Sequence, residues 1–198
     1  KKMRTTLDIK EPGLNVLPPG VERHLVNMGG LTGLQIFPDD QIEIINEEGN
    51  QICEIICFDK NGKPELGILN LKENSKKSFI KEILNNNEES SLITKLQLKK
   101  RNLNINNSKS SIIFDKDSSS GEKVKLKSKD KCYVIFSAPK NEMLINDQNP
   151  SSDLTIFIKR AKINKDKELS IIPDPVYDPS YEKNIDRQTC ISYQVKEG

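Results

Sequence analysis

Three short apolar runs that follow one another between residues 34 and 58 constrain the fold more than any other feature. The runs occupy residues 34–37, 41–45 and 51–58, and each is closed by a cluster of turn-forming residues. Short alternating runs bounded by such clusters are typical of β-strands joined by turns. The turn at residues 46–50 contains Gly49, which can adopt a positive φ. The sequence therefore predicts a three-stranded meander with a hairpin at this second turn.

Other segments have strand or helix patterns. Strands are predicted at residues 111–114, 124–126, 132–136 and 154–158, and residues 21–33 indicate a short strand and a glycine turn. Residues 74–87 are predicted to form a helix because their apolar residues share one face, with Ser75 as the cap. Residues 90–98 fit either a helix or a strand. We therefore expect an α+β, β-rich fold, either barrel-like or made of two packed antiparallel sheets with one or two helices.

Proline and glycine positions predict the domain boundaries. We expect an N-terminal arm at residues 1–20, a β-rich domain at residues 21–170, a Pro-rich linker at residues 171–185 and the first strand of a second unit at residues 186–198. The last of these ends in "SYQVKEG", an alternating stretch followed by a turn signal. We therefore expect the chain to be the N-terminal piece of a longer protein.

Composition narrows the class of protein. Thirty-one basic and 29 acidic side chains give a net charge of +2, so there is no large field to attract nucleic acid. No apolar stretch reaches 18 residues, and the first residues lack the apolar core of a signal peptide. We expect a cytoplasmic protein with neither a nucleic-acid nor a membrane partner. The four cysteines show no disulfide-scaffold spacing, which agrees with that location.

Glu54 is the acid that the sequence singles out for chemistry. On a strand it shares a face with Ile52, Ile56 and Phe58, and burial among such neighbours raises a carboxyl pKa. A raised pKa suits a general acid or base. The alternative is that Glu54 lies at a sheet edge and is solvated.

The remaining candidates for catalysis or metal binding are few. His24 is the only histidine, so any Ser-His-Asp or Cys-His arrangement must use it. Cys53 and Cys57 share the opposite strand face with no second ligand pair nearby, so we predict buried thiols and no metal site. The glycines of "MGGLTG" lack the following helix and the lysine of a phosphate loop, which favours a turn.

A resemblance adds to this interpretation. The stretch "LPPGVERHLVNMGGLTGLQIFPDDQIEIINEEGNQICEIICF", residues 17–58, resembles the opening of the urea carboxylase-associated domain family. The shared features are an aspartate turn, a strand of alternating aliphatics, the turn Glu48-Gly49-Asn50-Gln51, and an acid at position 54. That acid is more usually aspartate in the family. The tail "DRQTCISYQVKEG" looks like the start of a second, truncated copy of the same domain.

The resemblance implies a role in amine or one-carbon metabolism. Tandem copies of this domain resemble a form fused to a glycine cleavage T-protein-like aminomethyltransferase. It implies that tetrahydrofolate would bind in the absent downstream domain, with no cofactor in the present piece. The main hypothesis is an accessory, non-catalytic domain whose partners are the downstream domains of the same polypeptide, with a small-molecule ligand also possible.

Two other hypotheses stay open. One is a metal-dependent amidohydrolase-like domain acting on a small urea- or guanidine-derived carboxylate. There Glu54 is the acid/base candidate, and Cys53 or Cys57 would lie with His24 near a metal for which no ligand set can be assigned. Gln51 and His24 are the candidates for ligand binding. The other is a protein-interaction module, which predicts an exposed apolar patch and no deep pocket.

Overall fold

The computed structural model describes residues 17–75, 78–85, 89–140 and 150–162. The predicted linker at residues 171–185 and the tail strand at residues 186–198 lie outside these ranges. The arm predicted at residues 1–20 is described only from residue 17. Domain boundaries therefore stay predictions.

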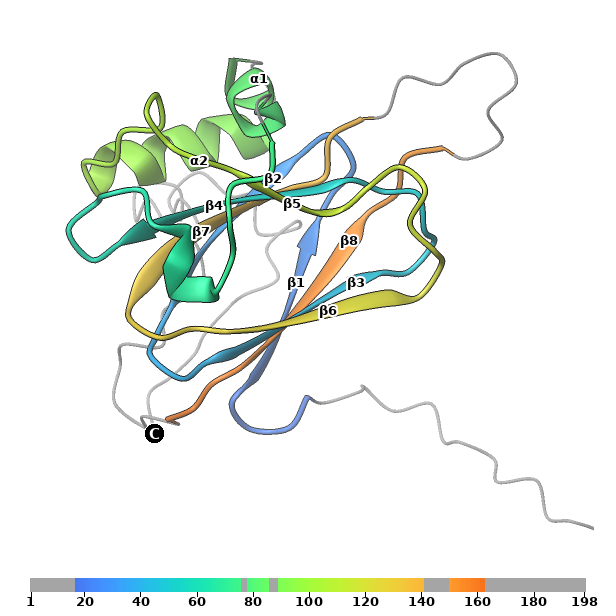
Figure 1. The fold of residues 1–198 in the computed structure, drawn as a ribbon, viewed down its shortest axis with the longest axis horizontal. Coiled ribbons are helices and arrows are strands. Elements are labelled where there is room, and N and C mark those ends of the chain that lie inside the picture. Colours follow the sequence, from blue (N-terminus) through green and yellow to red (C-terminus); the bar gives the residue numbers. More distant parts are fainter. Residues whose placement is uncertain (1–16, 76–77, 86–88, 141–149, 163–198) are drawn as a thin grey trace, which may run out of the picture. The chain divides into compact units, whose positions relative to one another are not determined.

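Eight strands form two four-stranded antiparallel sheets in the described residues (Figure 1). Sheet A has the order β1-β8-β3-β6, from Val21–Val26, Leu154–Lys159, Gln41–Asn46 and Glu122–Lys127. Sheet B has the order β2-β7-β4-β5, from Leu31–Ile36, Cys132–Ser137, Cys53–Asp59 and Ser111–Phe114. Two helices, α1 (Phe79–Asn85) and α2 (Glu89–Lys100), and a 3₁₀ turn at Leu66–Leu69 complete the part of the chain that the structure describes. The predicted α+β, β-rich class with two antiparallel sheets is confirmed.

The predicted three-stranded meander, with its hairpin between residues 41–45 and 51–58, is wrong, because β2 and β4 lie in sheet B and β3 lies in sheet A. β3 pairs with β6 and β8 in sheet A, whereas β4 pairs with β5 and β7 in sheet B. Gly49 does adopt a positive φ, of 82°. Asn46 stabilises the connection that crosses between the sheets: its Nδ2 donates to the Gln51 carbonyl at 3.1 Å and to Ser118 Oγ at 2.7 Å. Its Oδ1 accepts from the Gly49 amide, so the turn is closed by a side chain instead of a strand ladder.

Both helix predictions need adjustment. Residues 90–98 belong to a helix, α2, and the helix predicted from residue 74 begins only at Phe79. Ser75 is not the cap of α1, because it forms an isolated β-bridge with Ser110.

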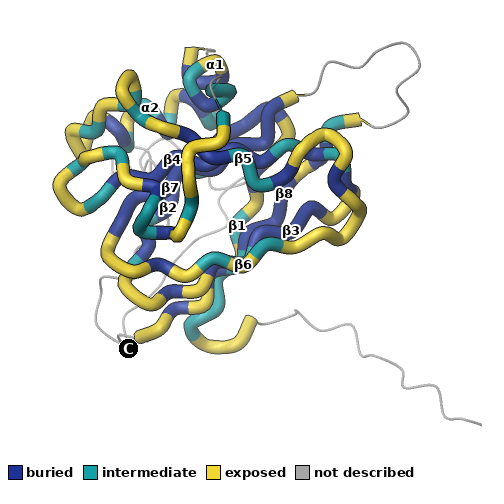
Figure 2. The backbone as a smooth tube through the Cα atoms, viewed as in Figure 1, coloured by how far each residue is buried: buried dark blue, intermediate teal, exposed yellow. Residues whose placement is uncertain are grey.

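The two central strands of sheet B, β4 and β7, are buried on both sides. One side chain set faces sheet A and includes Ile55, Val134 and Phe136, all fully buried. The other set packs against α1 and α2 in a cluster: Leu31, Ile56, Phe58, Tyr133 and Ile135 from the strands, and Ile80, Ile83, Leu84 and Leu98 from the helices. In Figure 1 the helices lie together over the strands of sheet B, and Figure 2 shows β4 and β7 as continuously buried.

In the part of the chain that the structure describes, no helix is both long enough and apolar enough to cross a membrane.

Candidate functional site

Glu54 lies under the first turn of α1, on the face of β4 that the helices cover. Its side chain is fully buried, so the alternative of a solvated edge position is wrong. β4 is an interior strand, with β5 on one side and β7 on the other. The amide of Ile80 donates a hydrogen bond to Glu54 Oε2 at 2.6 Å. This contact satisfies one of the backbone amides that the start of a helix leaves without an intrahelical partner.

The environment of Glu54 favours its neutral form. Burial raises the pKa of the carboxyl above its ordinary value, and bonds from the Ser110 hydroxyl and the Ile80 amide offset only part of that effect. Neither Glu54 Oε1 nor the nearby Ser78 Oγ has a well-formed hydrogen bond to another described residue. A neutral carboxyl there could hold or release a proton. A substrate would reach it only if α1 moved, because no part of the side chain is exposed.

Gln51 is a fully buried link between three segments. Its Nε2 donates to the carbonyls of Ile52 and Pro139, each at 2.9 Å, and its Oε1 accepts from the amide of Ser152 at 2.8 Å. Both amide hydrogens and one carbonyl lone pair are therefore used inside the fold. This geometry gives Gln51 a clear structural role.

His24 lies on β1 in sheet A, next to Glu22. Its Nε2 is 3.1 Å from Glu22 Oε2, and the imidazole is 17% exposed. Glu54 accepts from the Ile80 amide, Gln51 donates to the Pro139 carbonyl and His24 contacts Glu22. The three predicted residues therefore share no hydrogen-bond partner. Their assignments to catalysis and ligand binding stay predictions.

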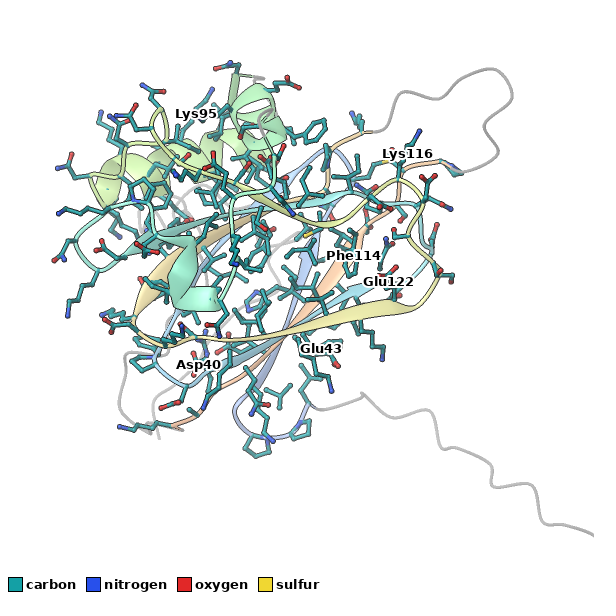
Figure 3. All side chains as sticks on the ribbon, viewed as in Figure 1. Asp40, Glu43, Lys95, Phe114, Lys116 and Glu122 are labelled. Carbon is teal, nitrogen blue, oxygen red and sulfur yellow. The ribbon has the colours of Figure 1, made fainter. Side chains whose placement is uncertain are left out.

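A buried arginine cluster joins the two sheets, and the sequence analysis missed it. Arg160, directly after β8, donates to both carboxylate oxygens of Glu22, at 2.7 and 2.8 Å, and to Asp40 Oδ2 at 2.5 Å. It also donates to the carbonyl of Gln35 at 3.1 Å. Burial acts to raise the pKa of Glu22, but bonds from His24 and Arg160 outweigh it and hold the pKa below its ordinary value. Figure 3 labels Asp40, in the turn between β2 and β3.

The three described cysteines all lie in sheet B, on β4 and β7. Cys53, Cys57 and Cys132 are buried free thiols. Burial strongly raises the pKa of Cys53, with a smaller contribution from the Glu54 charge, so the thiolate is disfavoured. Within residues 17–75, 78–85, 89–140 and 150–162, no three His, Cys, Asp or Glu side chains lie close enough together to hold a metal ion.

The outer face of sheet A carries a groove of about 670 Å³. Its lining comes from all four strands of the sheet, namely Val21, Gln41, Ile42, Glu43, Ile45, Lys123, Lys125, Leu126, Lys127, Phe157 and Lys159. Glu43, labelled in Figure 3, pairs with Lys125 at 3.3 Å across the β3–β6 ladder. Apolar side chains therefore lie beside several cations on a surface that no described helix covers.

Comparison with known proteins gives one informative relative. The chain is 30% identical over 190 residues to the trimethylamine-oxide aldolase of Ruegeria pomeroyi. The match covers 96% of this chain but 24% of the relative, so the chain spans about a quarter of that enzyme's length. No family model matches the chain. Similarity to an enzyme of amine metabolism is therefore shown, and the urea carboxylase-associated resemblance stays a prediction.

Proposed function

We propose that this chain is an accessory, non-catalytic part of a larger protein of amine metabolism. The observation that carries the proposal is the match to trimethylamine-oxide aldolase, which extends along 96% of this chain and takes up 24% of the relative. High coverage of the shorter chain with low coverage of the longer one is expected when one domain of a larger enzyme is compared with the whole enzyme.

The contacts of the candidate residues support the same proposal. Glu54 holds the start of α1, Gln51 holds three segments together and His24 bonds to the Glu22 partner of Arg160. A catalytic carboxylate must come within hydrogen-bond reach of the proton that it transfers. Glu54 is closed off from solvent by the fold that it stabilises.

The proposal places the chemistry elsewhere in the larger protein. Its partners would be the downstream domains of the same polypeptide. Following the aminomethyltransferase resemblance, one-carbon chemistry with tetrahydrofolate would belong to those domains, in the cytoplasm. The urea carboxylase-associated fold would then serve to position or stabilise them.

A domain exchange tests the proposal. This chain would replace the matching quarter of the Ruegeria pomeroyi enzyme, and turnover of trimethylamine oxide would be measured for the chimera, the unmodified relative and the isolated chain. We expect turnover by the chimera and none by the isolated chain. Turnover of trimethylamine oxide by the isolated chain would contradict an accessory role, as would a folded chimera with no activity.

The raised pKa of Glu54 favours one second candidate, the amidohydrolase-like domain. In that case the isolated chain should hydrolyse a small carboxylated urea or guanidine, and Glu54→Gln should abolish the reaction. Under the accessory proposal, Glu54→Gln leaves the turnover of the chimera unchanged. The same variant therefore separates the two candidates.

A further inference from the structure

The outer faces of the two sheets differ in what covers them. α1 and α2 pack on strands of sheet B, and neither helix has an extensive contact with any strand of sheet A. Strand register sets the outer rows of sheet A: Arg23, Phe157, Glu43 and Lys125 form the middle row, with Val21, Lys159, Gln41 and Lys127 on one side of it. On its other side lies the row of Leu25, Thr155, Ile45 and Lys123. These residues therefore make one continuous surface, which we call the sheet A face.

The sheet A face concentrates positive charge. Arg23, Lys123, Lys125, Lys127 and Lys159 lie on it, and Glu43 is the acid within its rows. Lys125 pairs with Glu43, and Lys127 pairs with Asp39 at 2.8 Å in the adjoining turn. Among the described residues, Arg23, Lys123 and Lys159 make no ion pair. The whole chain carries a net charge of only +2, so this face departs strongly from the average.

The same face has an apolar floor. Phe157 and Val21 are half-buried, and Ile45 is 9% exposed. All three line the groove, with lysines at its rim. An apolar centre with a charged rim is the usual organisation of a protein–protein interface.

We propose that the sheet A face docks an acidic polypeptide surface that inserts an apolar side chain against Phe157. The proposal rests on the proposed function, because the partner would be another part of the same larger protein. Carboxylates of the partner would meet the rim cations, and complementary charge of this kind speeds association and fixes orientation.

Three other occupants fit the face less well. A small-molecule site encloses most of its ligand, whereas Lys125 and Lys127 are 79% and 60% exposed at an open rim. A second copy would oppose the same five cations to each other. Nucleic acid would bring phosphates onto Glu43, which lies in the middle of the row beside Phe157.

Zero-length carbodiimide cross-linking of the chimera tests the proposal, because it joins a lysine amine only to a carboxylate in direct contact. We expect cross-links from Lys123 or Lys159 to carboxylates outside the exchanged quarter. The triple variant Arg23→Glu, Lys123→Glu, Lys159→Glu leaves Lys125 and Lys127 on the face, and it should reduce their cross-links at least fivefold. A salt concentration of 1 M should have the same effect on the unmodified chimera. The matched control Lys72→Glu, Lys99→Glu, Lys116→Glu makes the same change of charge away from the face and should leave them unchanged.

The outcomes separate this inference from the proposed function. A chimera that turns over trimethylamine oxide without face cross-links overturns docking and keeps the accessory role. Face-specific cross-links in a folded but inactive chimera support docking and overturn the accessory role. If the chimera does not fold, the chain and the truncated relative are mixed as two proteins, and the same cross-links decide. Binding of a single-stranded oligonucleotide that the triple variant abolishes would also overturn the proposal.

Discussion

Sheets A and B each have four antiparallel strands, yet they use their outer faces in opposite ways. In sheet B, β4 has six consecutive buried residues because sheet A covers one side and the helices cover the other. In sheet A, the edge strand β6 alternates between half-buried and exposed residues, and its exposed positions include three lysines. Figure 2 shows this difference as continuous dark blue along β4 and alternating teal and yellow along β6.

The comparison separates residues that resemble catalytic groups from residues that are exposed to a binding partner. Glu54 attracts attention as an acid among apolar neighbours, but it lies on the covered face and bonds to the start of α1. The lysines of β6 form a plain alternating pattern, but they lie on the open face beside a groove. In this chain, the burial of one titratable side chain is therefore a weaker guide to function than whether helices cover the outer face of the sheet.

Arg160 joins the two sheets, and its removal should have the largest effect on stability. Arg160→Ala leaves Glu22 and the buried Asp40 without their shared cation, which should cost about 3–5 kcal/mol in the free energy of unfolding. Urea denaturation measures this loss. Lys159→Ala, which removes the adjacent exposed cation, is the control and should change stability by less than about 0.5 kcal/mol. A loss below about 1 kcal/mol for Arg160→Ala would show that the cluster does not hold the sheets together.

The cover over sheet B can be tested with matched truncations on the two outer faces. Ile56→Ala removes a fully buried side chain from the cluster under α1 and α2 and should cost about 2–5 kcal/mol. Leu25→Ala removes an apolar side chain that is 46% exposed on the outer face of sheet A, and should cost less than about 1 kcal/mol. Equal losses in thermal unfolding of the isolated chain would mean that the two faces are covered to the same extent.

Gly33 tests how closely α2 packs on sheet B. A Cβ at this position would overlap Tyr133 Oη and lie 2.9 Å from Gln97 Oε1, and the hydrogen bond between these two atoms joins β7 to α2. Gly33→Ala should therefore cost about 1–3 kcal/mol through displacement of these side chains. Adding Tyr133→Phe, which removes the hydroxyl, should recover part of the loss in urea denaturation. No recovery would place the strain elsewhere.

The positions of the strands could be predicted from the sequence, but their partners could not. The predicted runs at 41–45, 111–114, 132–136 and 154–158 match β3, β5, β7 and β8 closely. Alternation is a local signal that reports which residues a strand buries. Sheet membership depends on contacts such as those of Asn46 with Ser118, which are 72 residues apart in sequence. That is why the turn at Gly49 was correctly predicted and the hairpin was not.

The ambiguity at residues 90–98 also has a physical cause. α2 buries Ser91 and Thr94 against the protein and exposes Leu92 and Leu96, the reverse of the usual helical pattern. The buried hydroxyls are satisfied by the carbonyls of Ile83, at 2.7 Å, and Ser90, at 2.8 Å. The sequence pattern does not reveal which carbonyls will accept from these hydroxyls. It also does not indicate that α1 covers Glu54.

Glu54 should make the stability of the chain depend on pH. Because the folded pKa lies above the unfolded value near 4.5, the folded state binds the proton more tightly, and stability falls as pH rises from about 4.5 through the folded pKa. One group contributes a slope of at most about 1.4 kcal/mol per pH unit. Glu54→Gln removes this slope, so the difference between the two proteins in urea denaturation, plotted against pH, isolates it. A difference that does not vary with pH would show that Glu54 is ionised in the fold.

The smallest expected effect on stability is that of Lys123, on the sheet A face. Lys123 is exposed and makes no ion pair with a described residue, so Lys123→Glu should change the free energy of unfolding by less than about 0.5 kcal/mol. The measurement matters because the docking experiment depends on it: a charge reversal that leaves the fold intact can report on the partner alone. Lys125→Glu is the informative companion, because it replaces the pair with Glu43 by two like charges directly opposite each other. If Lys123→Glu destabilised the chain more than Lys125→Glu did, the lysines of β6 would belong to the fold, and the contrast between the covered and the open sheet would weaken.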